Sequence, residues 1–320
     1  MGLYELLGYR RRWQVLSGLR RTYRSSLAPV VIGGCGGSGT TLLRACLDAH
    51  PEIACGPEST VFLRRVSSQV TLAQRLGMPA DLIDDLLRGY PSQAQFIEAF
   101  GRAVLQQGGK GVWADKTPEN IGRIAFVFRH FPGARFVHVV RDGRDVACSI
   151  RHSSWMKLPT ALRGAPEGLR RAACYWASRI RAGLAYRSDP RYTEVRYEDL
   201  VREPERTLRH LLNFLEVQWS DAVLDRGEVG QELNVSERRG LARATGPIYL
   251  TSVGRWQTEC TASEASLLQS ELASELATLG YLSGRAMPRL QLVPAGLRAA
   301  EAETARQRVA ADSARSAAGD

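Results

Sequence analysis

A glycine-rich turn between an apolar run and a helix start dominates residues 29–44, which read Pro-Val-Val-Ile-Gly-Gly-Cys-Gly-Gly-Ser-Gly-Thr-Thr-Leu-Leu-Arg. The apolar run predicts a buried strand, and the residues from Thr40 onward predict a helix. The free N–H groups of such a loop and the positive end of the helix dipole together bind anions. We therefore expect a strand, loop and helix unit that holds a phosphate ester. A tight glycine-rich turn without a ligand is the alternative.

This loop lacks the lysine that nucleotide triphosphatases carry. Their loop has the form G-x-x-x-x-G-K-[ST], in which the lysine reaches the terminal phosphates. Here the stretch from Gly34 to Gly39 has the glycine spacing, but Thr40 and Thr41 follow it. A triphosphate held with magnesium is therefore disfavoured, and the positive charge has to come from another segment.

Length and composition describe a globular chain. Its 320 residues, 44% of them hydrophobic, suffice for one large domain or two modest ones. Apolar runs long enough to span a membrane and the features of a signal peptide are missing, so we expect a cytoplasmic enzyme without a transmembrane segment. The six cysteines form no C-x-x-C pair and no zinc spacing, and we expect them to be reduced and buried.

The net charge of +10 is almost wholly due to arginine, since Lys110, Lys116 and Lys157 are the only lysines. Arginine suits bidentate recognition of phosphate and sulfate. The basic residues are scattered along the chain and form no basic stripe with interleaved aromatic residues. We therefore expect no nucleic-acid partner.

Strand and helix patterns alternate along the chain, which predicts an α/β fold with three layers around a central parallel sheet. Further strands are expected at residues 112–116, 136–140 and 193–197, and further helices at 69–108, 118–131, 168–188, 204–215 and 261–280. Thr117 reads as an N-cap with Pro118 in the first turn. Thr261 and Glu264 have the spacing of a capping box.

Three segments are distinguished by composition. Residues 1–28 mix arginines with leucines and predict a helix that either packs on the domain with a solvated basic face or makes peripheral contact with a membrane. Residues 29–284 form the main domain. Residues 285–320 are rich in Ala, Arg, Glu and Gln and predict a flexible tail.

Ligands of open parallel sheets bind beyond the carboxyl ends of the strands. Three expected strand ends deliver Gly36 to Thr41, then Lys116, then Arg141 with Arg144 and Ser149. Lys116 can thus supply the charge that the glycine loop lacks. Three segments bring anion-binding groups to one edge of the sheet.

Each of these basic residues has a structural alternative. Lys116 could form a salt bridge with Asp115 or Glu119, and Arg141 and Arg144 could pair with the aspartates of their own Arg-Asp-Gly-Arg-Asp run. Position at a strand terminus favours phosphate binding for the arginines.

With these residues in view, the chain resembles the sulfotransferases that use 3′-phosphoadenosine 5′-phosphosulfate (PAPS), and most of all the tyrosylprotein sulfotransferases. The likeness covers approximately residues 29–284 and implies their P-loop-NTPase-like topology. The shared residues are Ile32-Gly-Gly, Ser38-Gly-Thr-Thr-Leu-Leu-Arg44, Leu47-Asp-Ala-His-Pro51, Cys55-Gly with Glu58, Asp115-Lys116, Phe131-Pro, Val140-Arg-Asp-Gly-Arg144, Tyr197-Glu and Trp219-Ser-Asp-Ala-Val-Leu224.

The resemblance implies a role for each site residue. Glu58 would be the general base, and Lys116 would stabilise the departing oxygen. The nucleotide would be held by Gly36, Gly37, Ser38, Gly39, Thr40 and Thr41 at its 5′-phosphosulfate, by Arg141 and Ser149 at its 3′-phosphate, by Tyr197 at the adenosine and by Arg255 closing over it.

The predicted function is transfer of the sulfuryl group from PAPS to an acceptor hydroxyl of a protein tyrosine, small molecule or glycan, with 3′,5′-ADP as product and no metal. A P-loop small-molecule kinase and a non-catalytic nucleotide-binding module are the alternatives. The chain departs from the family pattern at Gly37, where an arginine is usual, and at Ser59-Thr60, where tyrosylprotein enzymes carry Thr-Arg. The second departure argues against recognition of an acidic peptide.

Overall fold

The computed structural model describes residues 23–63, 77–90, 92–151, 165–225 and 252–282. The chain divides into a unit of residues 1–278 and a unit of residues 279–320, and the fold described below belongs to the first. Residues 1–22 of the segment 1–28 and the whole predicted tail, residues 285–320, lie outside the described residues. Within the described ranges, no helix combines the length and the apolar character needed to cross a membrane.

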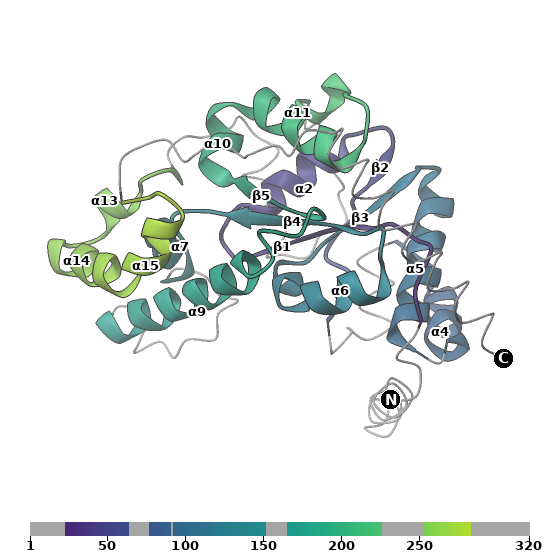
Figure 1. Ribbon diagram of the computed structural model, residues 1–320, viewed down its shortest axis with the longest axis horizontal. Coiled ribbons are helices and arrows are strands. Elements are labelled where there is room, and N and C mark those ends of the chain that lie inside the picture. Colours follow the sequence, from purple (N-terminus) through teal and green to yellow (C-terminus); the bar gives the residue numbers. More distant parts are fainter. Residues whose placement is uncertain (1–22, 64–76, 91, 152–164, 226–251, 283–320) are drawn as a thin grey trace, which may run out of the picture. The chain divides into compact units, whose positions relative to one another are not determined.

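Five parallel strands form the central sheet, in the order β2-β3-β1-β4-β5 (Figure 1). They are β1 (Val30–Gly34), β2 (Ile53–Ala54), β3 (Val112–Lys116), β4 (Arg135–Val140) and β5 (Tyr192–Arg196). Strand β1 is buried throughout and pairs with β3 on one side and β4 on the other. The strand order reverses at β1, so its carboxyl end is the topological switch point where such folds bind ligands.

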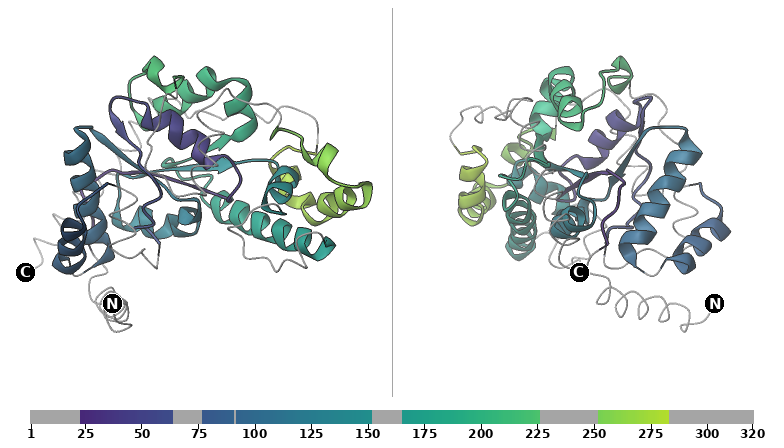
Figure 2. Two further views of the ribbon diagram at one scale, coloured as in Figure 1. Left: turned by 180° about the vertical axis from the view of Figure 1, so that it is seen from behind. Right: turned by 45° about the vertical axis from the view of Figure 1, so that its right-hand side comes forward.

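Helices cover both faces of the sheet. Helices α2 (Thr40–Asp48), α10 (Tyr197–Arg202) and α11 (Pro204–Leu215) lie on one face, while α6 (Ile124–His130) and α9 (Pro166–Leu184) lie on the other, as the front and back views both show (Figures 1 and 2). The remaining helices are α4 (Ala80–Gly89), α5 (Gln93–Gly108), α7 (Gly143–Arg151), α13 (Trp256–Glu259), α14 (Ala262–Glu271) and α15 (Ala273–Thr278), with the 3₁₀ turns η1 (Pro118–Arg123) and η2 (Asp221–Val223).

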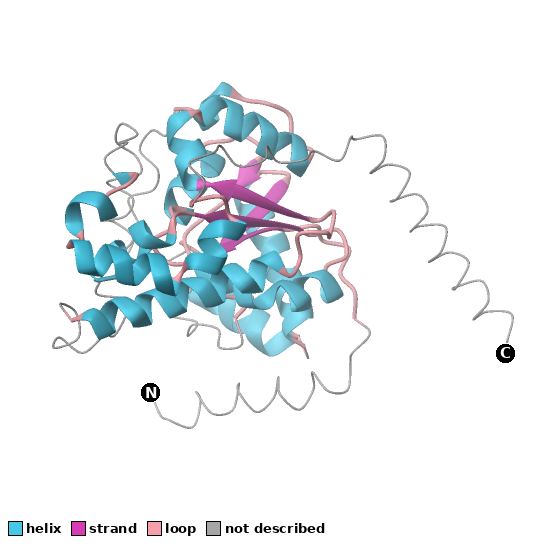
Figure 3. Cartoon of the chain, turned by 60° about the vertical axis from the view of Figure 1, so that its left-hand side comes forward, coloured by secondary structure: helices cyan, strands magenta, loops and turns pink. Residues whose placement is uncertain are grey.

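The alternation of side chains along β1 creates two cores. Val30 and Ile32 join the leucines of α2 and α11 in one hydrophobic cluster, whereas Val31 joins the aromatic residues of α5 and α6 in the other. Successive residues of a strand point to opposite faces, so a short apolar strand serves both layers. The three-layer architecture with its parallel sheet, visible from the side in Figure 3, confirms the predicted fold class.

Most predicted elements form, with instructive differences. Helix α11 has the predicted bounds, and Thr261 and Glu264 form the predicted capping box. Residues 118–131 do not form one helix, because a 3₁₀ turn precedes α6. Thr117 stands at the N-cap position, but its side chain does not cap. Its hydroxyl instead donates to Asp115 at 3.3 Å and accepts from the Thr60 amide at 3.3 Å.

The remaining differences concern chain ends and cysteines. The predicted final helix is divided into α14 and α15, and Tyr197 begins α10 rather than ending a strand. All six cysteines are free thiols, but the prediction that all are buried is wrong. Cys174 is exposed because it lies on the outer face of α9, and Cys260 is partly exposed at the end of α13.

His138 is the one titratable group in the middle of β4. Its side chain is fully buried, and its Nδ1 lies 2.6 Å from the Tyr192 hydroxyl. The desolvation that burial imposes lowers the pKa of His138 to about 3. The folded protein therefore keeps this imidazole neutral at every pH at which it is expected to work.

Stability should fall in acid because the unfolded chain protonates His138 near its ordinary pKa while the folded chain does not. Between pH 6.5 and 5, we expect this group to reduce the free energy of unfolding by up to about 1.4 kcal/mol per pH unit. Urea denaturation across this range checks it. His138→Gln should flatten the slope, whereas substituting the exposed His210 by Gln should leave it unchanged. An identical slope in all three proteins would contradict the assignment.

Candidate active site

Lys116, the last residue of β3, forms a close ion pair with Glu58. The Lys116 Nζ lies 2.6 Å from the Glu58 Oε1, and the side chains are 1% and 26% exposed respectively. Lys116 therefore does not pair with Asp115 or Glu119, the two partners considered from the sequence. The two residues predicted to carry the catalysis lie together, with one buried cation next to one carboxylate that solvent can reach.

Asp115 fixes the loop that carries Glu58. Its buried carboxylate accepts hydrogen bonds from Asn120 Nδ2 at 2.7 Å, from Thr117 and from the Ser59 hydroxyl. Burial raises the pKa of Asp115, and these three hydrogen bonds oppose that rise. Since Ser59 adjoins Glu58, this network determines where the general base candidate stands. The role of Asp115 was not predicted, although the Asp-Lys pair at a strand end was the available signal.

The glycine loop leaves β1 and turns into α2 through two left-handed residues. Gly37 and Gly39 have φ angles of 87° and 94°, a region that favours glycine. A Cβ at Gly39 would collide with the ring of Tyr197, and one at Gly37 would lie 3.2 Å from the Ser149 Oγ. Tyr197 and Ser149, both predicted to bind the nucleotide, therefore line this loop.

Donors in the loop remain free for a ligand. Helix α2 begins after Gly39, a residue with no side chain to cap it, so within the described residues its first N–H groups have no side-chain cap. The Ser38 hydroxyl is fully buried and has no hydrogen-bond partner within the described residues. A buried hydroxyl without a partner is costly, which makes the Ser38 hydroxyl a candidate donor to a ligand.

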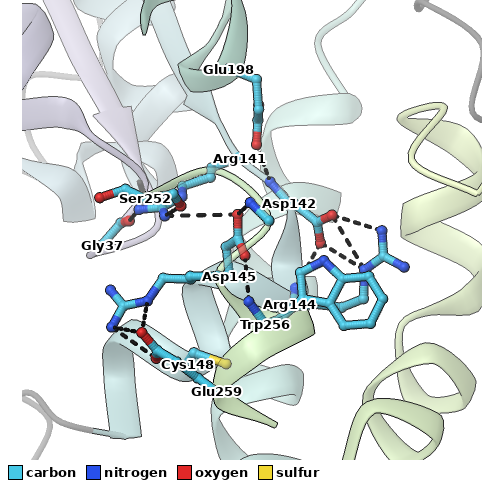
Figure 4. A network of polar contacts seen from close by, with 12 residues as sticks. Gly37, Arg141, Asp142, Arg144, Asp145, Cys148, Glu198, Ser252, Trp256 and Glu259 are labelled. Carbon is cyan, nitrogen blue, oxygen red and sulfur yellow. Dashed lines mark hydrogen bonds and ion pairs between the residues drawn. The ribbon is translucent and has the colours of Figure 1, made fainter. Parts of the chain in front are cut away.

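Arg141 follows β4 and reaches the loop from the other side (Figure 4). Its Nη1 donates to the Gly37 carbonyl at 3.0 Å, and its guanidinium carbon lies 4.4 Å from the centre of the Tyr197 ring. A second nitrogen donates to the Ser252 carbonyl and lies 3.8 Å from Asp145. The Arg141 Nε is buried and has no partner in the described part of the chain, so this donor remains available to an anion.

Arg144 has the structural role considered for it. It forms an ion pair with Asp142 at 2.7 Å, and its guanidinium lies 4.1 Å from the ring of Trp256. Asp145 accepts the amides of Gly254 and Trp256 at 2.8 and 3.1 Å, which draws the segment 252–256 onto α7 (Figure 4). Burial raises the pKa of Asp145, and the two amides and Arg141 oppose that rise.

Arg255 lies on this same segment. Its side chain forms an ion pair with Glu259, one helical turn away, at 2.9 Å. The structure therefore brings its backbone near the Arg141 site, and its predicted closure over a nucleotide stays a prediction. Among the described residues, no group of three or more His, Cys, Asp or Glu side chains could hold a metal ion.

Comparison with known proteins identifies the family. Residues 29–221 match the sulfotransferase family. The chain belongs to this family. It is 28% identical over 267 residues to protein-tyrosine sulfotransferase 1 of Danio rerio, covering 81% of this chain and 74% of that protein, and 29% identical over 272 residues to protein-tyrosine sulfotransferase 2 of Gallus gallus, covering 81% and 71%.

Solved structures agree on the fold of this sulfotransferase. The sulfotransferase domain from the curacin biosynthetic pathway aligns with a TM-score of 0.58 at 22% identity, covering 78% of this chain and 99% of that one. Mouse sulfotransferase SULT7A1, solved in complex with PAP, aligns with a TM-score of 0.53 at 13% identity, covering 83% and 90%. The family match and the curated relatives confirm the predicted family and enzyme class.

The approach of Tyr197 to Gly39 leaves no room for a side chain at this glycine unless the Tyr197 ring moves. We expect Gly39→Ala to lower the free energy of unfolding by about 2–4 kcal/mol, because backbone strain adds to displacement of the ring. Gly109 also has a positive φ, of 60°, but nothing lies within 4 Å of a Cβ there, so Gly109→Ala measures the strain alone. Equal losses in the free energy of unfolding of the two variants, measured by denaturant titration, would show that the Tyr197 ring adds no steric cost at Gly39.

Proposed function

We propose that this sulfotransferase moves the sulfuryl group of PAPS to an acceptor hydroxyl, with Glu58 as general base and Lys116 at the bridging oxygen. The observation that carries the proposal is the 2.6 Å contact between Lys116 and Glu58 at the strand end beside the glycine loop. Sulfuryl transfer needs a base that takes the proton of the acceptor hydroxyl and a cation that stabilises the charge on the leaving oxygen, and both have to stand at one reacting centre.

The donor is inferred from the unsatisfied groups. The Ser38 hydroxyl and the uncapped start of α2 fit the anionic 5′ end of the nucleotide, and the Arg141 Nε fits a second, separate anion. Ser149 lies beside the loop at Gly37. A nucleotide with a 3′-phosphate as well as a 5′-phosphosulfate supplies both anions.

The reaction proposed is an in-line displacement. Glu58 takes the proton of the acceptor hydroxyl, the acceptor oxygen forms a bond to sulfur, and the bond from sulfur to the bridging oxygen breaks. Lys116 and the loop N–H groups balance the charge that builds on the 5′-phosphate of the leaving 3′,5′-ADP. The ion pair between Lys116 and Glu58 opens when the acceptor and donor enter between them. No step calls on a metal.

For the acceptor we propose a phenolic hydroxyl. Several relatives are named protein-tyrosine sulfotransferases, and a phenol, with a pKa of about 10, gives up its proton to a carboxylate more readily than an alcohol does. Thr60 stands where those enzymes are expected to carry an arginine, so we propose a phenol without strongly acidic flanking groups.

Mass spectrometry of reactions with PAPS and a panel of tyrosine peptides, phenols, sugars and lipids should show gain of SO₃ on a phenol. Transfer of ³²P from γ-labelled ATP would instead support the kinase.

Glu58→Gln should lower kcat by about two to four orders of magnitude, because it removes the base while keeping the shape. Lys116→Ala should lower kcat by about two to three orders of magnitude and change the affinity for 3′,5′-ADP far less. The exposed carboxylate of Glu119 provides the control, since Glu119→Gln should retain full turnover. Binding of 3′,5′-ADP with no loss of turnover in Glu58→Gln would favour another base, and absence of any turnover in the unmodified protein would favour the binding module.

Arg141 should discriminate nucleotides by their 3′-phosphate. We expect Arg141→Ala to weaken binding of 3′,5′-ADP by about 10- to 100-fold, the loss typical of a hydrogen bond to a charged group, and to leave binding of 5′-AMP nearly unchanged. Arg135, at the opposite end of β4, pairs with Glu216 and serves as the matched control. Calorimetric titrations in which Arg141→Ala loses the same affinity for both nucleotides would show that Arg141 does not bind the 3′-phosphate.

A further inference from the structure

Two cysteines that the proposed transfer does not use lie in contact. Cys148 is on α7 and Cys260 directly follows α13, and they are 112 positions apart in the chain. Their Sγ atoms are 3.2 Å apart, and both are free thiols. Formation of a disulfide requires the two sulfurs to approach to about 2.0 Å, a small movement from this starting point.

The two thiols join parts of the nucleotide site. Helix α7 begins just after Arg141, and the segment 252–260, which ends at Cys260, covers it (Figure 4). This segment is held by the Ser252 carbonyl on Arg141 and by the Gly254 and Trp256 amides on Asp145. The thiol pair lies at the far end of the same contact. A covalent bond there would fasten the second end of the segment to α7, while its first end is held on Arg141.

The two thiols differ in access. Cys148 is buried, whereas Cys260 is partly exposed. Burial, followed by the contact with Cys260, raises the pKa of the Cys148 thiol. An external oxidant therefore reacts first with Cys260, and Cys148 completes the reaction as the resolving thiol.

We propose that Cys148 and Cys260 are a modification site, a dithiol that a small-molecule disulfide such as oxidised glutathione converts into a disulfide that latches segment 252–260 onto α7. The Cys260 thiolate attacks one sulfur of oxidised glutathione, forms a mixed disulfide and releases one reduced glutathione. The Cys148 thiolate then attacks the Cys260 sulfur and releases the second. The two protein thiols lose two electrons and two protons, and the two glutathiones gain them.

The consequence for the enzyme rests on the proposed function. The latch keeps the Ser252 carbonyl on Arg141, the residue proposed to hold the 3′-phosphate, and so restrains a segment that would move aside when nucleotide enters or leaves. Oxidation should therefore slow both association and dissociation of 3′,5′-ADP, by about tenfold. In the cytoplasmic location that we propose, such a bond is reversible and responds to the glutathione pool.

The test compares the full chain before and after treatment with oxidised glutathione. Peptide mapping without reductant should find Cys148 linked to Cys260, and hydrogen exchange at the Gly254 and Trp256 amides should slow, because the latch keeps both on Asp145. Cys260→Ser should abolish both effects. Cys174→Ser, which removes the exposed thiol of α9, should keep them. Absence of the linked peptide, or a linked peptide without slower exchange, would overturn the proposal.

Stopped-flow measurements with 3′,5′-ADP then separate the two proposals. If the reduced protein binds 3′,5′-ADP and the oxidised protein binds and releases it more slowly, with recovery after a reductant, the latch is supported. Equal rates in both forms would overturn the gating role. If the reduced protein does not bind 3′,5′-ADP, the proposed donor is wrong, while the peptide map and the hydrogen exchange still decide whether the dithiol is a latch.

Discussion

A lysine ammonium buried at the end of a strand has to be neutralised, and the construction of the candidate site at this edge of the sheet depends on this requirement. Lys116 is almost fully withdrawn from solvent, so a charge of opposite sign has to stand against it. Glu58 supplies that charge, and the network of Asp115 with Ser59 and Asn120 keeps its loop in place. The same arrangement that satisfies a buried charge also brings the proposed base and a cation to one point. Stability of the edge and chemistry at the edge thus have a common physical origin.

The second half of the site is organised around a cation whose hydrogen bonds are only partly satisfied. Arg141 is held by backbone carbonyls of two segments and by the face of Tyr197, which fixes its direction, yet its Nε has no partner in the described chain. The Ser38 hydroxyl likewise has no hydrogen-bond partner in the described chain. Rigid placement combined with unsatisfied donors is typical of a site prepared for an anion, because the ordering cost is met before the ligand arrives.

Local patterns along the chain predict the parts of this structure that depend on neighbouring residues. The apolar run before the glycine loop, the capping box at Thr261 and the bounds of α11 follow from such patterns, and the placement of Lys116 and Arg141 at strand ends follows from the parallel sheet. Contacts between distant segments were not predictable in this way. Three kinds of contact depend on tertiary packing. They are the ion pair of Lys116 with Glu58, the hydrogen bonds of the Thr117 hydroxyl with Asp115 and Thr60, and the contact of Cys148 with Cys260. The local sequence around one partner of such a contact does not identify the other partner.

The central position of β1 has a consequence for how the molecule is made. Val30 pairs with Ala114 and with Arg135, so the first strand of the sheet has no neighbour on either side until much later parts of the chain exist. During synthesis from the N-terminus, this apolar strand and its glycine loop emerge unpaired. Strand pairs between residues this far apart in the sequence form slowly, because the entropy cost of closing a large loop comes before the favourable contacts of the pair. The glycine loop, which we propose binds the anion, is therefore among the earliest segments to be synthesised and among the last to acquire its shape.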